Sequence, residues 1–160
     1  MKKYISILLV IVAILSVCAC YDLDRYPEDK INTNTFWKTQ QHAEQGINAI
    51  YAMFQNYYIF GSYFSLDCLG EVGTGYGEHG NENISRGTYN SLDNRILNRW
   101  TYLYEGVARA NLAIQNIPKI HATDSEIATL MGEAKFLRSL FYFYLTDFFG
   151  GVPIYDEKTI

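Results

Sequence analysis

The sequence predicts an all-α fold, and three observations support this prediction. Apolar residues recur at alternating spacings of four and three in three segments, which places them on one face of an α-helix. Capping and terminating residues bound the long segments. No alternation of apolar and polar residues is long enough to indicate a β-strand. The length of 160 residues suits one domain or a piece of a larger one.

Residues 1–19 have the layout of a secretory signal peptide. Two lysines form a basic start, residues 4–17 are apolar apart from two serines, and the small residue Ala19 precedes Cys20. Leucine or valine, a variable residue, alanine or glycine and then cysteine is the pattern at which bacterial lipoproteins are acylated and cleaved. We therefore predict a lipoprotein signal peptide over 1–19 and lipid attachment at Cys20. Cys18 is not the predicted site, because it follows the bulky Val17.

An uncleaved membrane anchor is the alternative for this leader. Residues 4–21 provide about 18 residues, which is the lower limit for spanning a bilayer. If Cys20 is acylated, residues 20–38 form a lipidated tether, which we expect to be extended because it mixes Asp, Asn, Thr and Pro27 without apolar periodicity. Residues 39–160 then form the helical domain.

The charge and cysteine content exclude several classes of protein. The chain has 13 basic and 17 acidic residues, and removing the leader with its two lysines changes the net charge from −4 to −6. An acidic chain without a basic run is not expected to bind nucleic acid. Cys68 is the only cysteine left after lipidation, so no disulfide within the chain is expected. The 14 tyrosines are typical of proteins that present ring faces to ligands, although many must fill the core.

The first predicted helix covers residues 39–57. Its apolar stripe consists of Ala43, Ile47, Ile50, Phe54 and Tyr57. Residues 58–91 then lose helical periodicity and contain seven of the twelve glycines, so we expect a long glycine-rich loop.

A helical hairpin is predicted over residues 92–149. Ser91 can cap the second helix, and Pro118 stops it. Thr123 and Glu126 form a capping box for the third helix, which ends at Gly150-Gly151. Two long helices joined by about six residues should pack antiparallel. The stripe of the second helix is Ile96, Trp100, Leu103, Val107, Ala110, Ile114 and Ile117. The stripe of the third is Ile127, Leu130, Ala134, Leu137, Phe141, Leu145 and Phe148. We expect Trp100, Phe136 and Phe141 in the core.

The order of several motifs resembles the SusD/RagB family of nutrient-binding outer-membrane lipoproteins. The resemblance is carried by Cys20 with Leu23-Asp24 and Pro27, by Phe36-Trp37-Lys38-Thr39, by Ala49-Ile50-Tyr51, by Trp100 with Leu103-Tyr104 and Ala110-Asn111, and by the run from Gly132 to Leu140 with Tyr142-Phe143 and Phe149-Gly150-Gly151-Val152-Pro153. It covers essentially the whole chain, in the order of the family. Family members are usually several times longer, so this chain resembles their N-terminal part, and a further part of the ligand site is expected elsewhere.

The resemblance implies tetratricopeptide-like helix pairs, although no internal repeat near 34 residues is visible. It also implies a lipid-anchored protein that faces the cell exterior and lies over a TonB-dependent, SusC-like transporter. Such a protein captures oligosaccharides, or in some members peptides, and has no catalytic activity and no cofactor. An unrelated membrane-anchored helical scaffold remains the alternative from another class.

The glycine-rich loop is the predicted ligand-contact region, because loops on a rigid helical scaffold often carry binding residues. Family members contact glycan from an insertion before the long helix. Sugars are held by aromatic faces that stack on their C–H surfaces and by amide or carboxylate groups that bond their hydroxyls. The candidate residues are Tyr63, Tyr76, His79, Asn81 and Tyr89. For each of them, packing of the loop is the alternative role.

Other patterns in the sequence do not support a dinucleotide site, a catalytic triad or a metal site. Residues 75–80 match G-x-G-x-x-G, but a dinucleotide site needs a helix next, and we expect loop at Asn81-Glu82-Asn83. The histidines His42, His79 and His121 fall in separate elements, which argues against a catalytic triad. A few acidic groups offer oxygen ligands for a cation but have no fixed spacing, so we expect them to be solvated. The candidate cation ligands are Asp67, Glu71, Glu78, His79 and Glu82.

Overall fold

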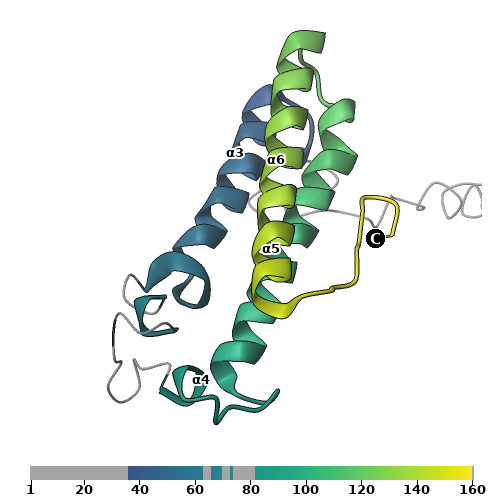
Figure 1. The fold of residues 1–160 in the computed structure, drawn as a ribbon. Helices are drawn as coiled ribbons and strands as arrows, with labels where there is room; N and C mark the ends of the chain where they lie inside the picture. The colour runs from purple at the N-terminus through teal and green to yellow at the C-terminus, as the bar shows by residue number, and fades with distance from the viewer. Residues whose placement is uncertain (1–35, 63–65, 70–72, 74–81, 160) are drawn as a thin grey trace, which may run out of the picture. The chain divides into compact units, whose positions relative to one another are not determined.

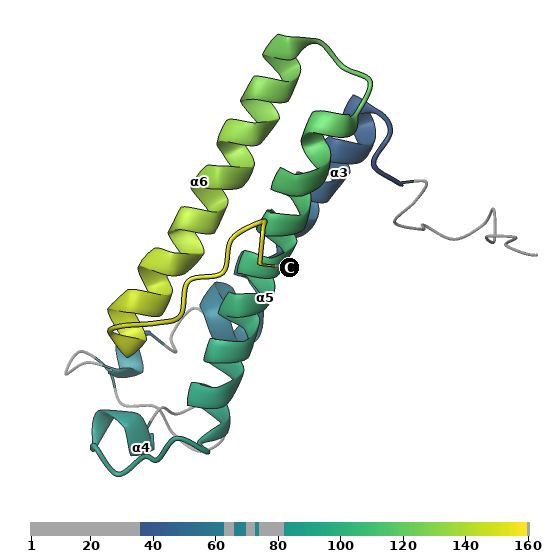
Figure 2. The ribbon, with the colours of Figure 1, turned by 90° about the vertical axis from the view of Figure 1, so that its right-hand side faces the viewer.

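The computed structural model describes residues 36–62, 66–69, 73 and 82–159. Three long helices dominate this part of the chain, with a short fourth helix before the second of them. They are α3 (Gln40–Tyr51), α4 (Glu82–Ser85), α5 (Asn94–Asn116) and α6 (Asp124–Phe149). Helices α5 and α6 lie side by side, and α3 packs along both (Figure 1, Figure 2). The described residues form no β-strand, only one isolated bridge, so the all-α prediction is confirmed.

Helix α3 begins where the sequence predicts but ends earlier. The Thr39 hydroxyl accepts a hydrogen bond from the His42 backbone N–H at 3.3 Å, which caps the helix. After Tyr51 the chain tightens into a 3-10 turn over Ala52–Gln55 and then a π turn over Tyr57–Gly61. A 3-10 turn has three residues per turn, so Met53 follows Ile50 into the core. The predicted stripe residues Phe54 and Tyr57 are consequently half-buried and exposed, respectively.

Helix α5 starts two residues later than the predicted start at residue 92. Asp93, and not Ser91, is its N-cap, because the Asp93 carboxylate accepts a hydrogen bond from the Arg95 N–H at 3.0 Å. The helix ends at Asn116, and Pro118 lies in a 3-10 turn that follows directly. The prediction of Ser91 as the N-cap is wrong, because the Asp93 carboxylate makes the capping hydrogen bond and the helix begins at the next residue.

Helix α6 follows the sequence prediction at both ends. The Glu126 carboxylate accepts hydrogen bonds from the Thr123 N–H at 2.8 Å and from the Thr123 hydroxyl at 2.7 Å, and the Glu126 N–H donates back to that hydroxyl at 3.4 Å. These bonds lower the pKa of Glu126 below its ordinary value. The helix ends at Phe149, and its C-cap is Gly150, whose φ of 74° lies in the region that favours glycine. With 26 residues, α6 is about 39 Å long.

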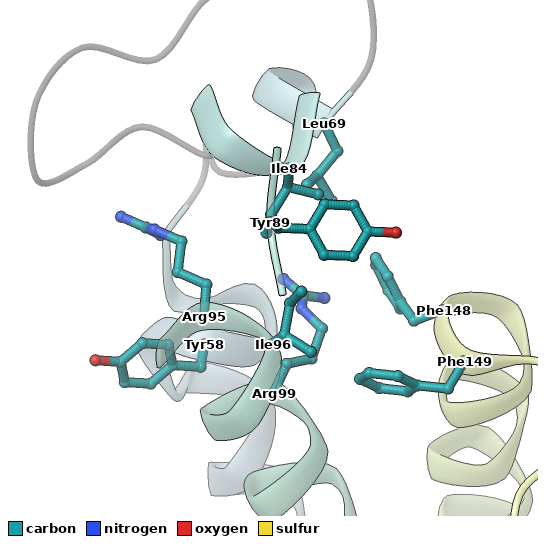
Figure 3. A pocket seen from close by; sticks show the side chains of 9 residues that line it. All are labelled: Tyr58, Leu69, Ile84, Tyr89, Arg95, Ile96, Arg99, Phe148 and Phe149. Atoms are coloured by element: carbon teal, nitrogen blue, oxygen red, sulfur yellow. The ribbon is translucent and has the colours of Figure 1, made fainter. Parts of the chain in front are cut away.

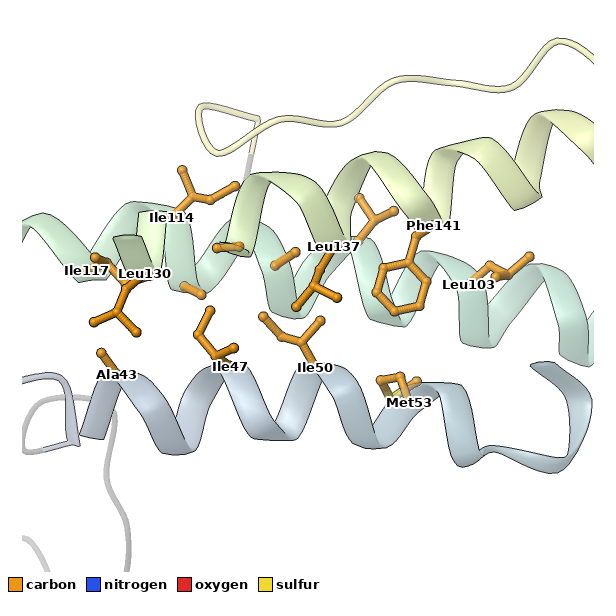
Figure 4. Packing of buried hydrophobic residues seen from close by; sticks show 14 of the residues in the cluster. Ala43, Ile47, Ile50, Met53, Leu103, Ile114, Ile117, Leu130, Leu137 and Phe141 are labelled. Carbon is orange, nitrogen blue, oxygen red and sulfur yellow. The ribbon is translucent and has the colours of Figure 1, made fainter. Parts of the chain in front are cut away.

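The hydrophobic core lies between the three long helices, as Figure 4 shows. The stripes of α5 and α6 meet there, and α3 contributes Ala43, Ile47 and Ile50. Phe141 is fully buried, as predicted, and Trp100 is half-buried against the core. Phe136 is 63% exposed, which makes its predicted core position wrong. It precedes the buried Leu137 by one residue, and one residue turns the helix by about 100°.

A glycine permits close packing of α6 on α5. A Cβ atom added at Gly106 would lie 2.4 Å from the Phe141 ring, so only glycine allows the ring to pack directly on the backbone of α5. The Phe141 ring also stacks on Phe54, with centroids 4.6 Å apart and planes 2° from parallel. Phe141 therefore contacts both α5 and the 3-10 turn after α3.

The described part of the glycine-rich insertion contains short helical turns. Asp67–Leu69 form a 3-10 turn with Cys68 buried and free, and Glu82–Ser85 form α4. The predicted loop at Asn81-Glu82-Asn83 is therefore wrong from Glu82 onward. A single turn of helix is too short to show the 3.6-residue periodicity on which the prediction relied.

The segment after α6 runs back along the hairpin and is held there by side chains (Figure 2). Arg138 donates one hydrogen bond to the buried Asn111 side chain at 2.7 Å and another to the Glu157 carboxylate at 2.6 Å. Asn111 in turn donates to the Tyr155 carbonyl at 3.0 Å. The Tyr104 hydroxyl donates to the Pro153 carbonyl at 2.7 Å. Several residues that carry the family resemblance thus hold this segment against α5 and α6 by hydrogen bonds.

Acid is expected to destabilise the wild-type chain more steeply than the variant Arg138→Gln. The hydrogen bond from Arg138 holds the pKa of Glu157 below its ordinary value of 4.5. A carboxyl group with a lowered folded-state pKa stabilises the fold above its ordinary pKa, and this contribution is lost as the pH falls through the lowered value. Thermal melts from about pH 7 to about pH 3 measure the effect.

The matched control for this prediction is Arg109→Gln. Arg109 pairs with Glu105 in an exposed contact within α5, far along the sequence from Glu157. Gln at position 138 keeps an N–H donor for Asn111 and removes the charge. If the melting temperatures of wild type and Arg138→Gln fall in parallel, the ion pair with Glu157 contributes nothing and the prediction fails.

The predicted signal peptide, Cys20 and most of the predicted tether lie outside the described residues. Residues Phe36–Ile160 form one unit, and Trp37 packs partly buried against its core. Within the described ranges, none of the helices combines the length and apolar character that crossing a bilayer requires.

Candidate functional site

A cavity of about 290 Å³ lies where the first turns of α5 face the last turn of α6, beside the described parts of the insertion. We call it the aromatic cavity. Four aromatic, three aliphatic and two arginine side chains line it. They are Tyr58, Tyr89, Phe148 and Phe149, then Leu69, Ile84 and Ile96, and finally Arg95 and Arg99 (Figure 3). This mixture of ring faces and fixed polar groups is typical of small-molecule sites.

Arg99 is the polar group set deepest in this site. It lies on the second turn of α5, is only 7% exposed, and places its guanidinium 4.2 Å from the centroid of the Phe148 ring. Burial, and to a smaller extent the nearby charge of Arg95, lower the pKa of Arg99 from its ordinary value to about 10. The guanidinium remains protonated at neutral pH and gives the cavity a positive charge.

The second arginine is tied to a tyrosine at the rim of the cavity. Arg95 donates a hydrogen bond to the Tyr57 hydroxyl at 3.1 Å and lies 5.4 Å from the centroid of the Tyr57 ring. Tyr58, which lines the cavity, stacks on Tyr102 of α5 with centroids 5.7 Å apart. These contacts hold the aromatic wall of the cavity against α5.

Of the five predicted ligand-contact residues, the structure describes only Tyr89. It lies between α4 and α5, is 51% exposed, and lines the aromatic cavity. Tyr63, Tyr76, His79 and Asn81 lie outside the described residues, so their role stays a prediction.

The described residues bring no predicted cation ligands together. Asp67 is exposed, and Glu71, Glu78 and His79 lie outside the described ranges. No group of three His, Cys, Asp or Glu side chains in the described part of the chain could hold a metal ion. Of the histidines in that part, His42 stacks on Phe36, and His121 donates its backbone N–H to the Lys38 carbonyl.

A second hollow lies under the segment that follows α6, with a volume of about 400 Å³. Trp100, Tyr104 and Tyr155 supply its aromatic wall, and Asn111 its buried polar group. Asn111 is already hydrogen-bonded to Tyr155 and Arg138. Since its buried polar group is occupied, this hollow is the weaker candidate for ligand binding.

Sequence reasoning missed Arg95, Arg99 and Phe149 as cavity residues. The two arginines are four residues apart and so lie on one face of α5, which was a weak signal of a positively charged surface. Phe148 was assigned to the stripe of α6, but it is half-buried at the cavity wall. The cavity is lined by residues between positions 58 and 149, and a local sequence pattern cannot predict contacts between residues so far apart in the sequence.

Comparison with known proteins places this fold among SusD-like proteins. The SusD-like family described as "Starch-binding associating with outer membrane" matches residues 22–159. SusD-like protein P2 of Formosa agariphila is 27% identical over 98% of this chain, and SusD-like protein P38 of the same organism is 29% identical over 100% of it. Each match covers 32% of the relative, so this chain spans about a third of the length of these curated relatives.

A solved structure has the same fold. The crystal structure of a SusD homolog from Bacteroides thetaiotaomicron superposes with a TM-score of 0.63 at 24% sequence identity. The superposition covers 79% of this chain and 26% of that chain. At this level of identity the comparison establishes the arrangement of the helices.

Proposed function

The chain belongs to the SusD-like family, and on this premise we propose that it serves to capture oligosaccharides at the surface of the outer membrane. The proposal assigns it no catalytic step. Family members are described as starch-binding and as associating with the outer membrane. The captured glycan would pass to a TonB-dependent, SusC-like transporter, and lipid attachment at Cys20 would hold the protein beside it.

The aromatic cavity is the observation that carries this proposal. Sugars present flat C–H surfaces that pack on aromatic rings, and hydroxyl groups that need fixed hydrogen-bond partners. Tyr89 and Phe148 supply ring faces, and Arg99 supplies N–H donors in the same cavity. The helices α5 and α6 are rigid supports for these groups, while Tyr89 comes from the connection before α5.

Replacing Tyr89 with alanine is expected to weaken glycan binding about two- to tenfold in the full-length gene product. The loss corresponds to about 0.5–1.5 kcal/mol for one aromatic contact. The test begins with a glycan and peptide screen, followed by isothermal titration of the best ligand against wild type and Tyr89→Ala. Because Tyr89 is half-exposed, its truncation should leave the melting temperature nearly unchanged.

Phe136→Ala is the matched control, since Phe136 is an exposed ring on α6 that does not line the cavity. Its affinity for the glycan should equal that of wild type. A best ligand that is a peptide, or turnover of the glycan by the purified protein, would contradict the proposed function. Equal affinity of wild type and Tyr89→Ala would place the binding site elsewhere.

A further inference from the structure

Arg99 is a buried cation that has no anionic partner in the described part of the chain. Ion pairs between described residues join Arg109 to Glu105 and Arg138 to Glu157, and neither pair includes Arg99. The Arg99 guanidinium packs on the Phe148 ring, which offers no hydrogen-bond acceptor. A guanidinium carries five N–H donors, and those of Arg99 have no acceptor among the described residues and keep access to solvent through the cavity.

A buried charge without a partner destabilises a folded protein, so the surroundings of Arg99 suggest that a ligand supplies the missing partner. Removing a guanidinium from water is unfavourable unless an anion or several acceptors replace the water. The charge that acts most directly on Arg99 is the positive charge of Arg95, which is repulsive. Burial and the neighbouring cation therefore both disfavour the charged form of Arg99 in the unliganded chain, and an anion would relieve both effects.

The free N–H groups face the aromatic cavity. In Figure 3 the Arg99 guanidinium lies below the Tyr89 ring and beside Phe148, within the space that the lining residues enclose. An anionic group that enters this space meets the fork of a guanidinium, which matches the two oxygens of a carboxylate or sulfate. The flanking rings leave apolar faces for the rest of the ligand.

Resting on the proposed glycan-binding function, we propose that the aromatic cavity takes an acidic saccharide. Its carboxylate or sulfate group pairs with Arg99, and the apolar face of the same or the next sugar ring packs on Tyr89 and Phe148. Arg95 adds positive potential at the rim. Neutral sugars lack the group that would compensate the Arg99 charge, so the cavity discriminates against them.

The experiment compares wild type with Arg99→Met in the full-length gene product. Methionine keeps an unbranched apolar stem that packs on Phe148 and removes the charge. The ligands are panels of uronic-acid oligosaccharides, sulfated oligosaccharides and neutral oligosaccharides of the same lengths. The uronic acids are also supplied as methyl esters and the sulfated sugars in desulfated form, so that each acidic group has a neutral match. Arg109→Gln removes an exposed charge from α5 and serves as the control.

We expect an acidic oligosaccharide to bind wild type, and its neutral match to bind much more weakly. Arg99→Met should lose roughly tenfold to a hundredfold in affinity for the acidic form and little for the neutral form. Arg109→Gln should bind as wild type. The panel that contains the binder distinguishes a carboxylate from a sulfate. Without ligand, Arg99→Met should melt at or above the temperature of wild type, because it relieves an unpaired buried charge.

Two results would overturn this inference and leave the proposed function intact. One is tight binding of a neutral oligosaccharide that does not depend on Arg99. The other is a melting temperature of unliganded Arg99→Met several degrees below wild type, which would mean that the charge of Arg99 is already compensated in the unliganded chain. Failure of every saccharide in all panels to bind would instead reject the proposed function and this inference with it.

Discussion

Phe141→Ala is expected to lower the free energy of unfolding by about 3–5 kcal/mol, the range for removing a large buried aromatic side chain. Phe141 has no exposed surface and is held between the backbone of α5 at Gly106 and the ring of Phe54. Truncation leaves a cavity where three elements meet, and the rigid helices on either side cannot collapse to fill it. Urea unfolding followed by circular dichroism measures the change.

The same substitution at Phe136 provides the control for Phe141. Both residues are phenylalanines on α6, five positions apart in the sequence. The Phe136 side chain is 63% exposed, whereas that of Phe141 is 0% exposed. Phe136→Ala should change the free energy of unfolding by no more than about 0.5 kcal/mol, because little apolar surface is transferred to water. Equal losses for the two variants would contradict the packing of α6 described above.

Cys20→Ala is expected to release the protein completely from the membrane. The residues Ala19 and Cys20 after an apolar leader predict a lipidated N-terminus, and the acyl chains would attach the protein to the membrane. A single acyl chain binds reversibly at about 0.8 kcal/mol per buried CH₂ group, and two or more chains make the anchorage stable. Without the thiol no chain can be attached. Cell fractionation and labelling with an alkyne fatty acid measure the effect.

The matched control for this prediction is Cys18→Ala, which should be labelled and fractionate as wild type. Normal labelling of Cys20→Ala together with loss of label in Cys18→Ala would show that the lipid is attached to Cys18 and that the prediction is wrong. A third outcome is a Cys20→Ala protein that stays in the membrane with its leader uncleaved. That outcome would favour the apolar segment over 4–21 as an anchor, since the described residues contain no helix able to span a bilayer.

The sequence alone was sufficient to predict the helical hairpin and most of its core. Spacings of four and three place Leu103 and Val107 on one side of α5, and Leu137 and Phe141 on one side of α6. This periodicity predicts that these sides are buried, and all four residues are buried. The capping box at Thr123 was also predictable, because its hydrogen bonds join residues only three positions apart. Local patterns succeed where the interaction itself is local.

Element boundaries were less predictable where two local signals compete. Ser91 and Asp93 are both good N-caps, and the folded chain uses the second. The end of α3 likewise depends on a change from α to 3-10 geometry after Tyr51, which moves Met53 into the core in place of Phe54. A propensity scale does not resolve such differences of two or three residues.

Only the tertiary structure could decide how distant residues meet. The aromatic cavity joins residues from the turn after α3, from the insertion with α4, from the start of α5 and from the end of α6, and the sequence predicted only Tyr89 among them as a ligand contact. That Arg99 is buried with no carboxylate of the described residues paired to it depends on what the other elements place nearby, which no spacing in the sequence records. Periodicity determines which side of a helix is covered, whereas packing of the whole chain determines which partner covers each residue.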